Sequence, residues 1–172
     1  MKMKFQISED QIFFFRRDGK LLLEEYFSSS FYLNKYMTLS DQASCNLRRK
    51  DHNLCKILCH NRLGHVLFQL TGERPIRLLC DQVVMSSEEI DIQQVPFFGV
   101  LIGLALPVAT SSLIIFSPRH SLCVKGAFLF VVYGFHDTRY RYMTNPLSYS
   151  LRGLGYESGD LLKGDDFPFV FR

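Results

Sequence analysis

The chain has 172 residues, of which 47% are hydrophobic and 14% aromatic, with 16 Phe and no Trp. So apolar a chain can bury a sizeable core, which excludes a disordered protein and favours one domain over residues 1–172. The formal net charge of +3, from 20 basic and 17 acidic residues, is too small to indicate nucleic acid as a partner.

The N-terminus and the cysteines bear on cellular location. Charged Glu9 and Asp10 stand where a secretory signal would have its apolar core, so no signal peptide is predicted. The five Cys residues are an odd number without the spacing of a disulfide framework. These features predict reduced thiols and a cytosolic setting.

Two β-prone runs near the N-terminus, 12–16 and 21–26, flank the dipeptide Asp18-Gly19. Asp-Gly tolerates the positive φ of a tight turn, so the pattern predicts a β-hairpin. A short strand over 4–8 is expected before this hairpin. An aromatic-rich strand over 31–39 is expected after it.

The segment 54–70 fits two structures. Leu54 and Leu58 have helical spacing, whereas Gly64 followed by the β-prone run 66–68 favours a break and then a strand. For the start of the segment both structures stay open, and for its end a strand is favoured. The whole chain is expected to contain at most one short helix.

Further strands are predicted from β-prone runs and from alternation of apolar and polar residues. Ile90 and Ile92 alternate with polar neighbours and place one face of their strand in a core. The expected strands are 77–85, 89–93, 127–133 and 138–142.

Residues 95–116 form a run of 22 residues without a charge, long and apolar enough for a membrane-spanning helix. Pro96, Gly99, Gly103 and Pro107 interrupt the run, however. Two buried strands joined by a turn explain these breaks better than a helix does. Altogether about ten short strands at hairpin spacing predict a mainly β, antiparallel sandwich or barrel.

Two clusters of side chains offer metal-ligand chemistry. The first is rich in Cys and His but matches no zinc finger, so its cysteines are expected to be small core residues and its histidines to lie in loops. The second is acidic and has oxygens for Ca²⁺, although a solvated acidic turn is favoured. The clusters are Cys45, His52, Cys55, Cys59, His60 and His65, and Glu157, Asp160, Asp165 and Asp166.

Several features between Gly64 and Ala127 occur in an order that resembles the phospholipid scramblase family. They are Gly64-His65-Val66, Leu70-Thr71-Gly72-Glu73-Arg74-Pro75-Ile76-Arg77, Cys80, Glu89-Ile90-Asp91-Ile92-Gln93, Pro96, Gly99, Ile102-Gly103 and Leu122-Cys123-Val124-Lys125-Gly126-Ala127. The resemblance implies the antiparallel β-barrel of the scramblase and Tubby-like group, which is wrapped around a central hydrophobic helix.

The resemblance also implies a function. This is calcium-stimulated, ATP-independent movement of phospholipids between leaflets, on the cytoplasmic face of the plasma membrane. A phospholipid membrane is then the main partner, with protein partners besides. Asp160, Asp165 and Asp166 are the implied Ca²⁺ ligands, and Cys80 is the implied site of palmitoylation. No catalytic residues are implied, so the chain is expected not to be an enzyme.

The sequence departs from the family at two points. Cys80 stands alone where the family has a run of cysteines, and one acyl chain gives only marginal membrane binding. The family's C-terminal hydrophobic helix has no counterpart, so an incomplete barrel is expected. The alternatives are a peripheral or cytoplasmic lipid- or protein-binding module of the same fold, and an unrelated membrane protein with a helix over 95–116.

Overall fold

The structure, a computed structural model, shows strands, three α-helices and one 3₁₀ helix among the residues that it describes. The described residues are 7–26, 45–86, 89–92, 95–108, 110–123, 126–143, 151 and 154–172.

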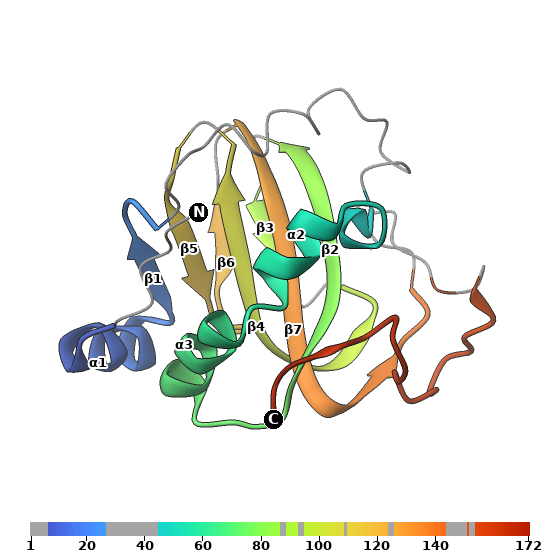
Figure 1. The fold of residues 1–172 in the computed structure, drawn as a ribbon. Helices are drawn as coiled ribbons and strands as arrows, with labels where there is room; N and C mark the ends of the chain where they lie inside the picture. The colour runs from blue at the N-terminus through green and yellow to red at the C-terminus, as the bar shows by residue number, and fades with distance from the viewer. Residues whose placement is uncertain are drawn as a thin grey trace.

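Antiparallel strands are the main regular structure of the described chain (Figure 1). A six-stranded sheet has the order β1-β5-β4-β7-β2-β8, and a two-stranded sheet pairs β3 with β6. The strands are β1 (Lys20–Leu23), β2 (Ile76–Ser86), β3 (Glu89–Asp91), β4 (Phe97–Pro107), β5 (Leu113–Phe116), β6 (Ser121–Cys123), β7 (Gly126–Tyr140) and β8 (Phe169–Phe171). The mainly β, antiparallel prediction is confirmed.

The long strands β2, β4 and β7 form the centre of the sheet, with β7 paired to both of the others. The ladder is interrupted where β2 shifts register between Leu78 and Cys80, and such bulges bend a sheet. β4 and β7 approach closely at Gly134, where a Cβ atom would lie 2.8 Å from the Gly99 carbonyl oxygen and 2.4 Å from Thr138 Oγ1. The sheet therefore curls into a half-barrel instead of lying flat.

The N-terminal hairpin prediction is wrong, because residues Glu9–Asp18 form helix α1. Ser8 and Gln11 make a reciprocal capping box at its start, which satisfies two backbone N–H groups that the helix leaves free. Gly19 has a φ of 67° and ends the helix, its N–H donating to the Phe15 carbonyl. The Asp-Gly pair thus ends a helix and does not form a hairpin turn.

The strand expected at 66–68 is also wrong. Two helices, α2 (His52–Leu58) and α3 (Asn61–Thr71), follow the 3₁₀ helix η3 (Leu47–Arg49). Gly64 does not break α3. A Cβ atom there would lie 2.5 Å from the Val170 carbonyl oxygen, so this glycine lets the helix pack against β8. With three α-helices in the described chain, the expectation of at most one short helix is wrong.

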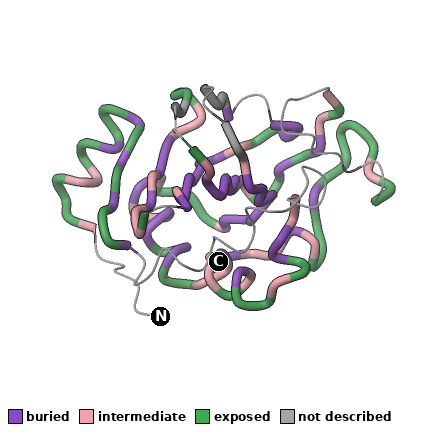
Figure 2. Tube along the Cα trace, turned by 90° about the horizontal axis from the view of Figure 1, so that it is seen from above, coloured by how far each residue is buried: buried purple, intermediate pink, exposed green. Residues whose placement is uncertain are grey.

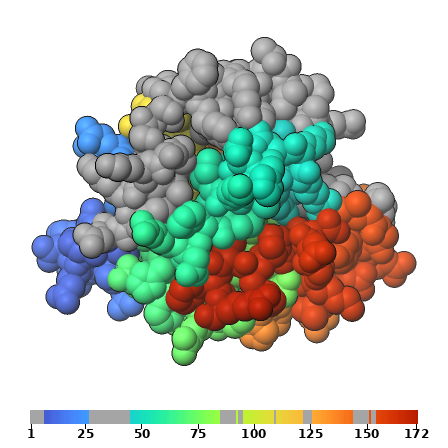
Figure 3. Space-filling model, viewed as in Figure 1, coloured from blue at the N-terminus to red at the C-terminus, as the bar shows by residue number. Residues whose placement is uncertain are grey.

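Two cores lie on opposite faces of the large sheet, and Figure 2 shows the buried positions along the chain. The first core joins the sheet to the helices and includes Leu58, Leu67 and Tyr133. The second is rich in aromatic rings and is closed by the C-terminal segment, which contributes Phe167. Figure 3 shows that segment running beside α3 across one face of the molecule.

The apolar run 95–116 contains strands β4 and β5. The prediction of two strands is therefore confirmed, and the alternative of a spanning helix is wrong. The described helices include none that is both long and apolar enough to cross a bilayer. The strand expected over 127–133 and the first three residues of that expected over 138–142 belong to one continuous strand, β7. The strand predicted over 31–39, and most of that over 4–8, lie outside the described residues.

Candidate functional site

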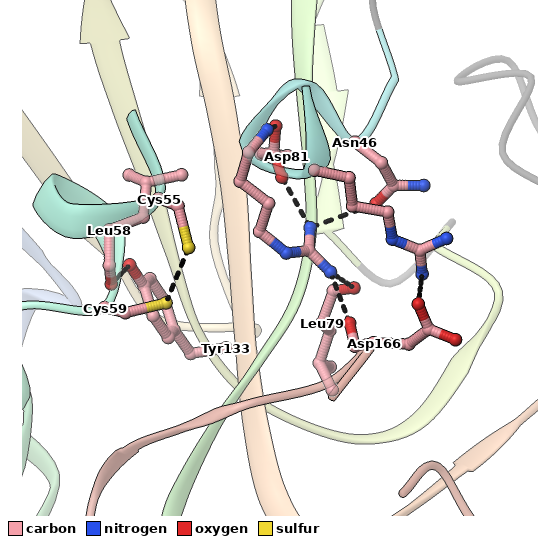
Figure 4. Close-up of polar contacts among 10 residues, drawn as sticks. Asn46, Cys55, Leu58, Cys59, Leu79, Asp81, Tyr133 and Asp166 are labelled. Carbon is pink, nitrogen blue, oxygen red and sulfur yellow. Dashed lines mark hydrogen bonds and ion pairs between the residues drawn. The ribbon is translucent and has the colours of Figure 1, made fainter. Parts of the chain in front are cut away.

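A buried ion pair joins η3 to the large sheet (Figure 4). Arg48 Nη1 lies 2.5 Å from Asp81 Oδ1, and the side chains are 3% and 0% exposed. The other oxygen, Asp81 Oδ2, accepts from the backbone N–H of Arg48 at 3.1 Å. A carboxylate with these two partners is well compensated for its burial.

The same guanidinium also holds the C-terminal segment. Arg48 Nη2 donates to the carbonyl oxygens of Leu79, at 3.2 Å, and Asp166, at 2.8 Å, while Nη1 also donates to Asn46 Oδ1 at 3.0 Å. Arg49 Nη2 adds an outer ion pair of 3.2 Å with Asp166 Oδ1. Both terminal nitrogens of Arg48 have protein acceptors, so this cluster fastens three segments together and is not open to a ligand.

Arg77, on β2, is a second buried guanidinium with different surroundings. Only 7% of the residue is exposed, and its Nη1 donates to the Phe167 carbonyl oxygen at 2.5 Å. Its guanidinium carbon lies 3.9 Å from the ring centroid of Phe169. Within the part of the chain that the structure describes, its Nε has no hydrogen-bond partner and no carboxylate pairs with it.

The pKa of Arg77 reflects its burial. Burial lowers the pKa of the Arg77 guanidinium, an effect partly offset by nearby Tyr156. Arginine nevertheless stays charged at physiological pH, so β2 carries a buried cation that no anion in the described part of the chain compensates. Tyr156 also packs edge-on against Phe167, with 5.6 Å between ring centroids, which places Arg77 at the border of the second core.

Two thiols lie beside the first core, on the face of the large sheet opposite to Arg77. Cys55 and Cys59 are separated by 4.0 Å between their Sγ atoms (Figure 4). Next to them, the buried Tyr133 hydroxyl donates to the Leu58 carbonyl oxygen at 2.8 Å. Burial raises the pKa of the Cys59 thiol to about 12, and the neighbouring Cys55 adds to the rise.

Cys80, the predicted lipidation site, is a core residue that is 3% exposed. Burial raises the pKa of its thiol, which keeps the sulfur protonated. Nothing tests Cys80 as a residue assignment, and the palmitoylation that the resemblance implied is corrected together with that resemblance below.

The three predicted Ca²⁺ ligands have separate local roles. Asp160 Oδ2 accepts from the backbone N–H of Glu157 at 2.8 Å, Asp165 is exposed, and Asp166 pairs with Arg49. Among the side chains that the structure describes, no three or more His, Cys, Asp or Glu come together in a group that could hold a metal ion. The individual residue assignments are not tested further and stay predictions.

Sequence reasoning named neither Arg48, Asp81 nor Arg77 as a site residue. The signal was present in β2, where Arg77 and Asp81 are charged residues inside an otherwise apolar strand. Charged residues are seldom fully buried unless they are paired. Which of the two had a partner depended on segments far away in the sequence.

No family model matches the chain, and no curated protein matches it. Several solved structures do. SnoK, a non-heme alpha ketoglutarate dependent carbocyclase from nogalamycin biosynthesis, is 13% identical with a TM-score of 0.74 over 98% of each chain. SnoN, a non-heme alpha ketoglutarate dependent epimerase from the same pathway, is 14% identical with a TM-score of 0.72 over 95% of this chain and 96% of its own.

CT296 from Chlamydia trachomatis is also similar, at 14% identity and a TM-score of 0.60 over 78% of this chain and 99% of its own. The chain has the fold of these proteins. The resemblance to phospholipid scramblases and the barrel around a central helix are therefore wrong, and so is the lipid-transport function, including the lipid- or protein-binding module of that fold. Short motifs in matching order did not determine the topology.

Two further expectations are corrected by the same comparison. The chain was expected not to be an enzyme, whereas SnoN and SnoK are an epimerase and a carbocyclase. Ca²⁺ was expected as the cofactor, whereas SnoN has been solved in complex with Fe³⁺, alpha ketoglutarate and nogalamycin RO.

The described side chains do not form a site for iron. Non-haem iron of this class is typically bound by two His and one carboxylate. The described side chains bring no such group together, so they do not fit iron.

Proposed function

We propose that this chain is an enzyme of small-molecule metabolism whose substrate or co-substrate is a small organic acid, and that Arg77 binds the carboxylate of this acid. The observation that carries the proposal is the buried Arg77 guanidinium with an unpartnered Nε and no carboxylate partner in the described chain. Ligand sites hold a few convergent polar groups of this kind among apolar side chains.

The energetic argument concerns the cost of an isolated buried cation. A buried charge without a counter-ion is strongly unfavourable, and one whose partner has been removed typically costs 3–5 kcal/mol. The Phe169 ring and the Phe167 carbonyl offset part of the cost at Arg77. A ligand carboxylate would supply the missing anion and accept from Nε, as the planar guanidinium fork favours.

Access to Arg77 depends on β8. This strand has three residues and pairs with β2 at two positions, Ile76 with Phe171 and Arg77 with Phe169. So short a strand contributes few backbone hydrogen bonds to β2, fewer than the long central strands do, although Val170 also packs in the first core. We infer that the ligand enters where Phe169 now covers the guanidinium.

The fold supports the choice of ligand class. Alpha ketoglutarate, present in the SnoN complex, is a dicarboxylate, and both SnoN and SnoK are described as dependent on it. An organic acid of this size offers a carboxylate for Arg77 and a carbon chain for the apolar wall formed by Phe167 and Phe169.

Calorimetric titration with alpha ketoglutarate, succinate and pyruvate tests binding, with dimethyl succinate as the uncharged control. We expect at least one acid to bind the wild-type chain and the diester not to bind. Arg77→Gln should weaken binding by more than tenfold, because a charge-assisted contact is lost, and Arg77→Lys should weaken it less.

Arg74→Gln is the matched control, since Arg74 is an exposed arginine three positions away. Its binding should equal that of the wild type. Proton NMR of the bound acid during incubation tests turnover, which should occur with the wild type and be lost in Arg77→Gln. If no acid binds, or if Arg77→Gln binds as tightly as the wild type, the proposal is wrong.

A further inference from the structure

The last turn of α2 carries two cysteines with a defined relative position. Cys55 lies inside the helix, and Cys59 is its C-terminal cap, with φ −97° and ψ 12°. Residues four apart in a helix have Cα atoms about 6 Å apart, inside the range found in disulfides. The Sγ atoms are 4.0 Å apart, so side-chain rotation and a small shift of the cap residue bring them within bonding distance.

The two sulfurs are placed so that one can resolve oxidation of the other. Both residues are half-buried, and burial raises the pKa of the Cys59 thiol, which slows direct attack by its sulfur on an oxidant. A sulfenic acid formed on Cys55 has the Cys59 sulfur 4.0 Å away, as in a pair made of a sensing and a resolving cysteine.

The position of this turn is tied to the middle of the sheet. Leu58, the residue before Cys59, is buried in the first core, and its carbonyl oxygen accepts from Tyr133 on β7 at 2.8 Å. The Cys59 N–H in turn donates to the Cys55 carbonyl oxygen at 2.9 Å. Any movement that draws Cys59 toward Cys55 therefore moves the Leu58 carbonyl relative to a fully buried tyrosine.

We infer that Cys55 and Cys59 form a reversible redox site, in which peroxide converts the two thiols into a disulfide that weakens the hydrogen bond between Tyr133 and Leu58. This inference is independent of the function proposed above, because it involves the opposite face of the sheet and other residues.

The chemistry balances with peroxide as the oxidant. The Cys55 thiolate attacks one oxygen of hydrogen peroxide, the O–O bond breaks, and hydroxide leaves and takes up a proton to give water. The resulting sulfenic acid is attacked by the sulfur of Cys59, which loses its proton as the S–S bond forms and a second water leaves. Two electrons pass from the sulfurs to the peroxide, and a dithiol reductant reverses the change.

Peptide mapping tests the bond directly, because Lys56 lies between the two cysteines. Trypsin separates Asp51–Lys56 from Ile57–Arg62, so a disulfide leaves these two peptides linked until a reductant is added. We expect the linked pair in the peroxide-treated wild type and in Cys45→Ser, which removes another half-buried thiol. It should be absent in Cys55→Ser and Cys59→Ser.

Thermal unfolding tests the coupling. Oxidation should lower the Tm of the wild type by about 3 °C, the shift expected for the loss of one buried hydrogen bond in a chain of this size. Tyr133→Phe should show a similar loss without oxidation and no further loss after it. Absence of the linked peptides, links from Cys55 to another cysteine, or an unchanged or raised Tm on oxidation would each overturn the inference.

Discussion

Arg48 on η3 and Arg77 on β2 are both buried arginines, but their surroundings differ. Arg48 pairs with Asp81 and donates to the carbonyl oxygens of Leu79 and Asp166. Arg77 has one carbonyl acceptor and an aromatic ring. Described residues satisfy the first arginine, whereas the Nε of the second has no hydrogen-bond partner among them. We expect the first to matter for stability and the second for ligand binding.

The largest effect is expected at the satisfied arginine. Asp81→Ala leaves the Arg48 guanidinium buried without its anion, which should cost about 3–5 kcal/mol of unfolding free energy. Urea unfolding measures this as a lower midpoint with an unchanged m value. A loss below about 1 kcal/mol would show that the Arg48–Asp81 ion pair contributes little to the stability of the fold.

A double variant separates the charge from the contacts around it. Replacing the pair with apolar residues of similar size, Arg48→Met with Asp81→Leu, removes the uncompensated charge and should recover most of the loss. A deficit of about 1–2 kcal/mol should remain, because the Leu79 and Asp166 carbonyls lose a donor. If the double variant is as unstable as Asp81→Ala, the charge is not the cause. Urea unfolding of both variants under the same conditions makes the comparison.

Arg77→Met should change stability much less than Asp81→Ala, by within about 1 kcal/mol, since removal of an uncompensated charge offsets the lost contacts with Phe167 and Phe169. Chemical unfolding of this variant beside the wild type measures the change. A loss of 3 kcal/mol or more would make Arg77 a structural residue like Arg48 and would break the comparison.

The smallest effect is expected at the outer ion pair. Arg49 and Asp166 have side chains 28% and 47% exposed, so solvent screens their attraction. Arg49→Gln should cost less than about 0.5 kcal/mol, and added salt should remove the difference from the wild type. Thermal unfolding at low and high salt measures both. A larger loss that persists in salt would show that the outer ion pair stabilises the fold in the same way as the buried pair of Arg48 and Asp81.

The sequence predicted the central strands well and the helix boundaries poorly. β2, β4, β5 and most of β7 follow from β-prone apolar runs that any buried sheet requires. α1 was mistaken for a hairpin because Asp18-Gly19 can form either a hairpin turn or a helix end. Gly64 was taken as a break because the sequence does not show that Val170 packs against it.

The sequence by itself determined a mainly β, antiparallel chain with a large apolar core and with two charges, Arg77 and Asp81, inside a buried strand. Only the tertiary structure decided what those charges do. Asp81 meets Arg48, which is 33 positions away, and Arg77 meets Phe167, which is 90 positions away. The cost of a buried charge depends on the groups around it in space, and the folded chain alone brings those groups together.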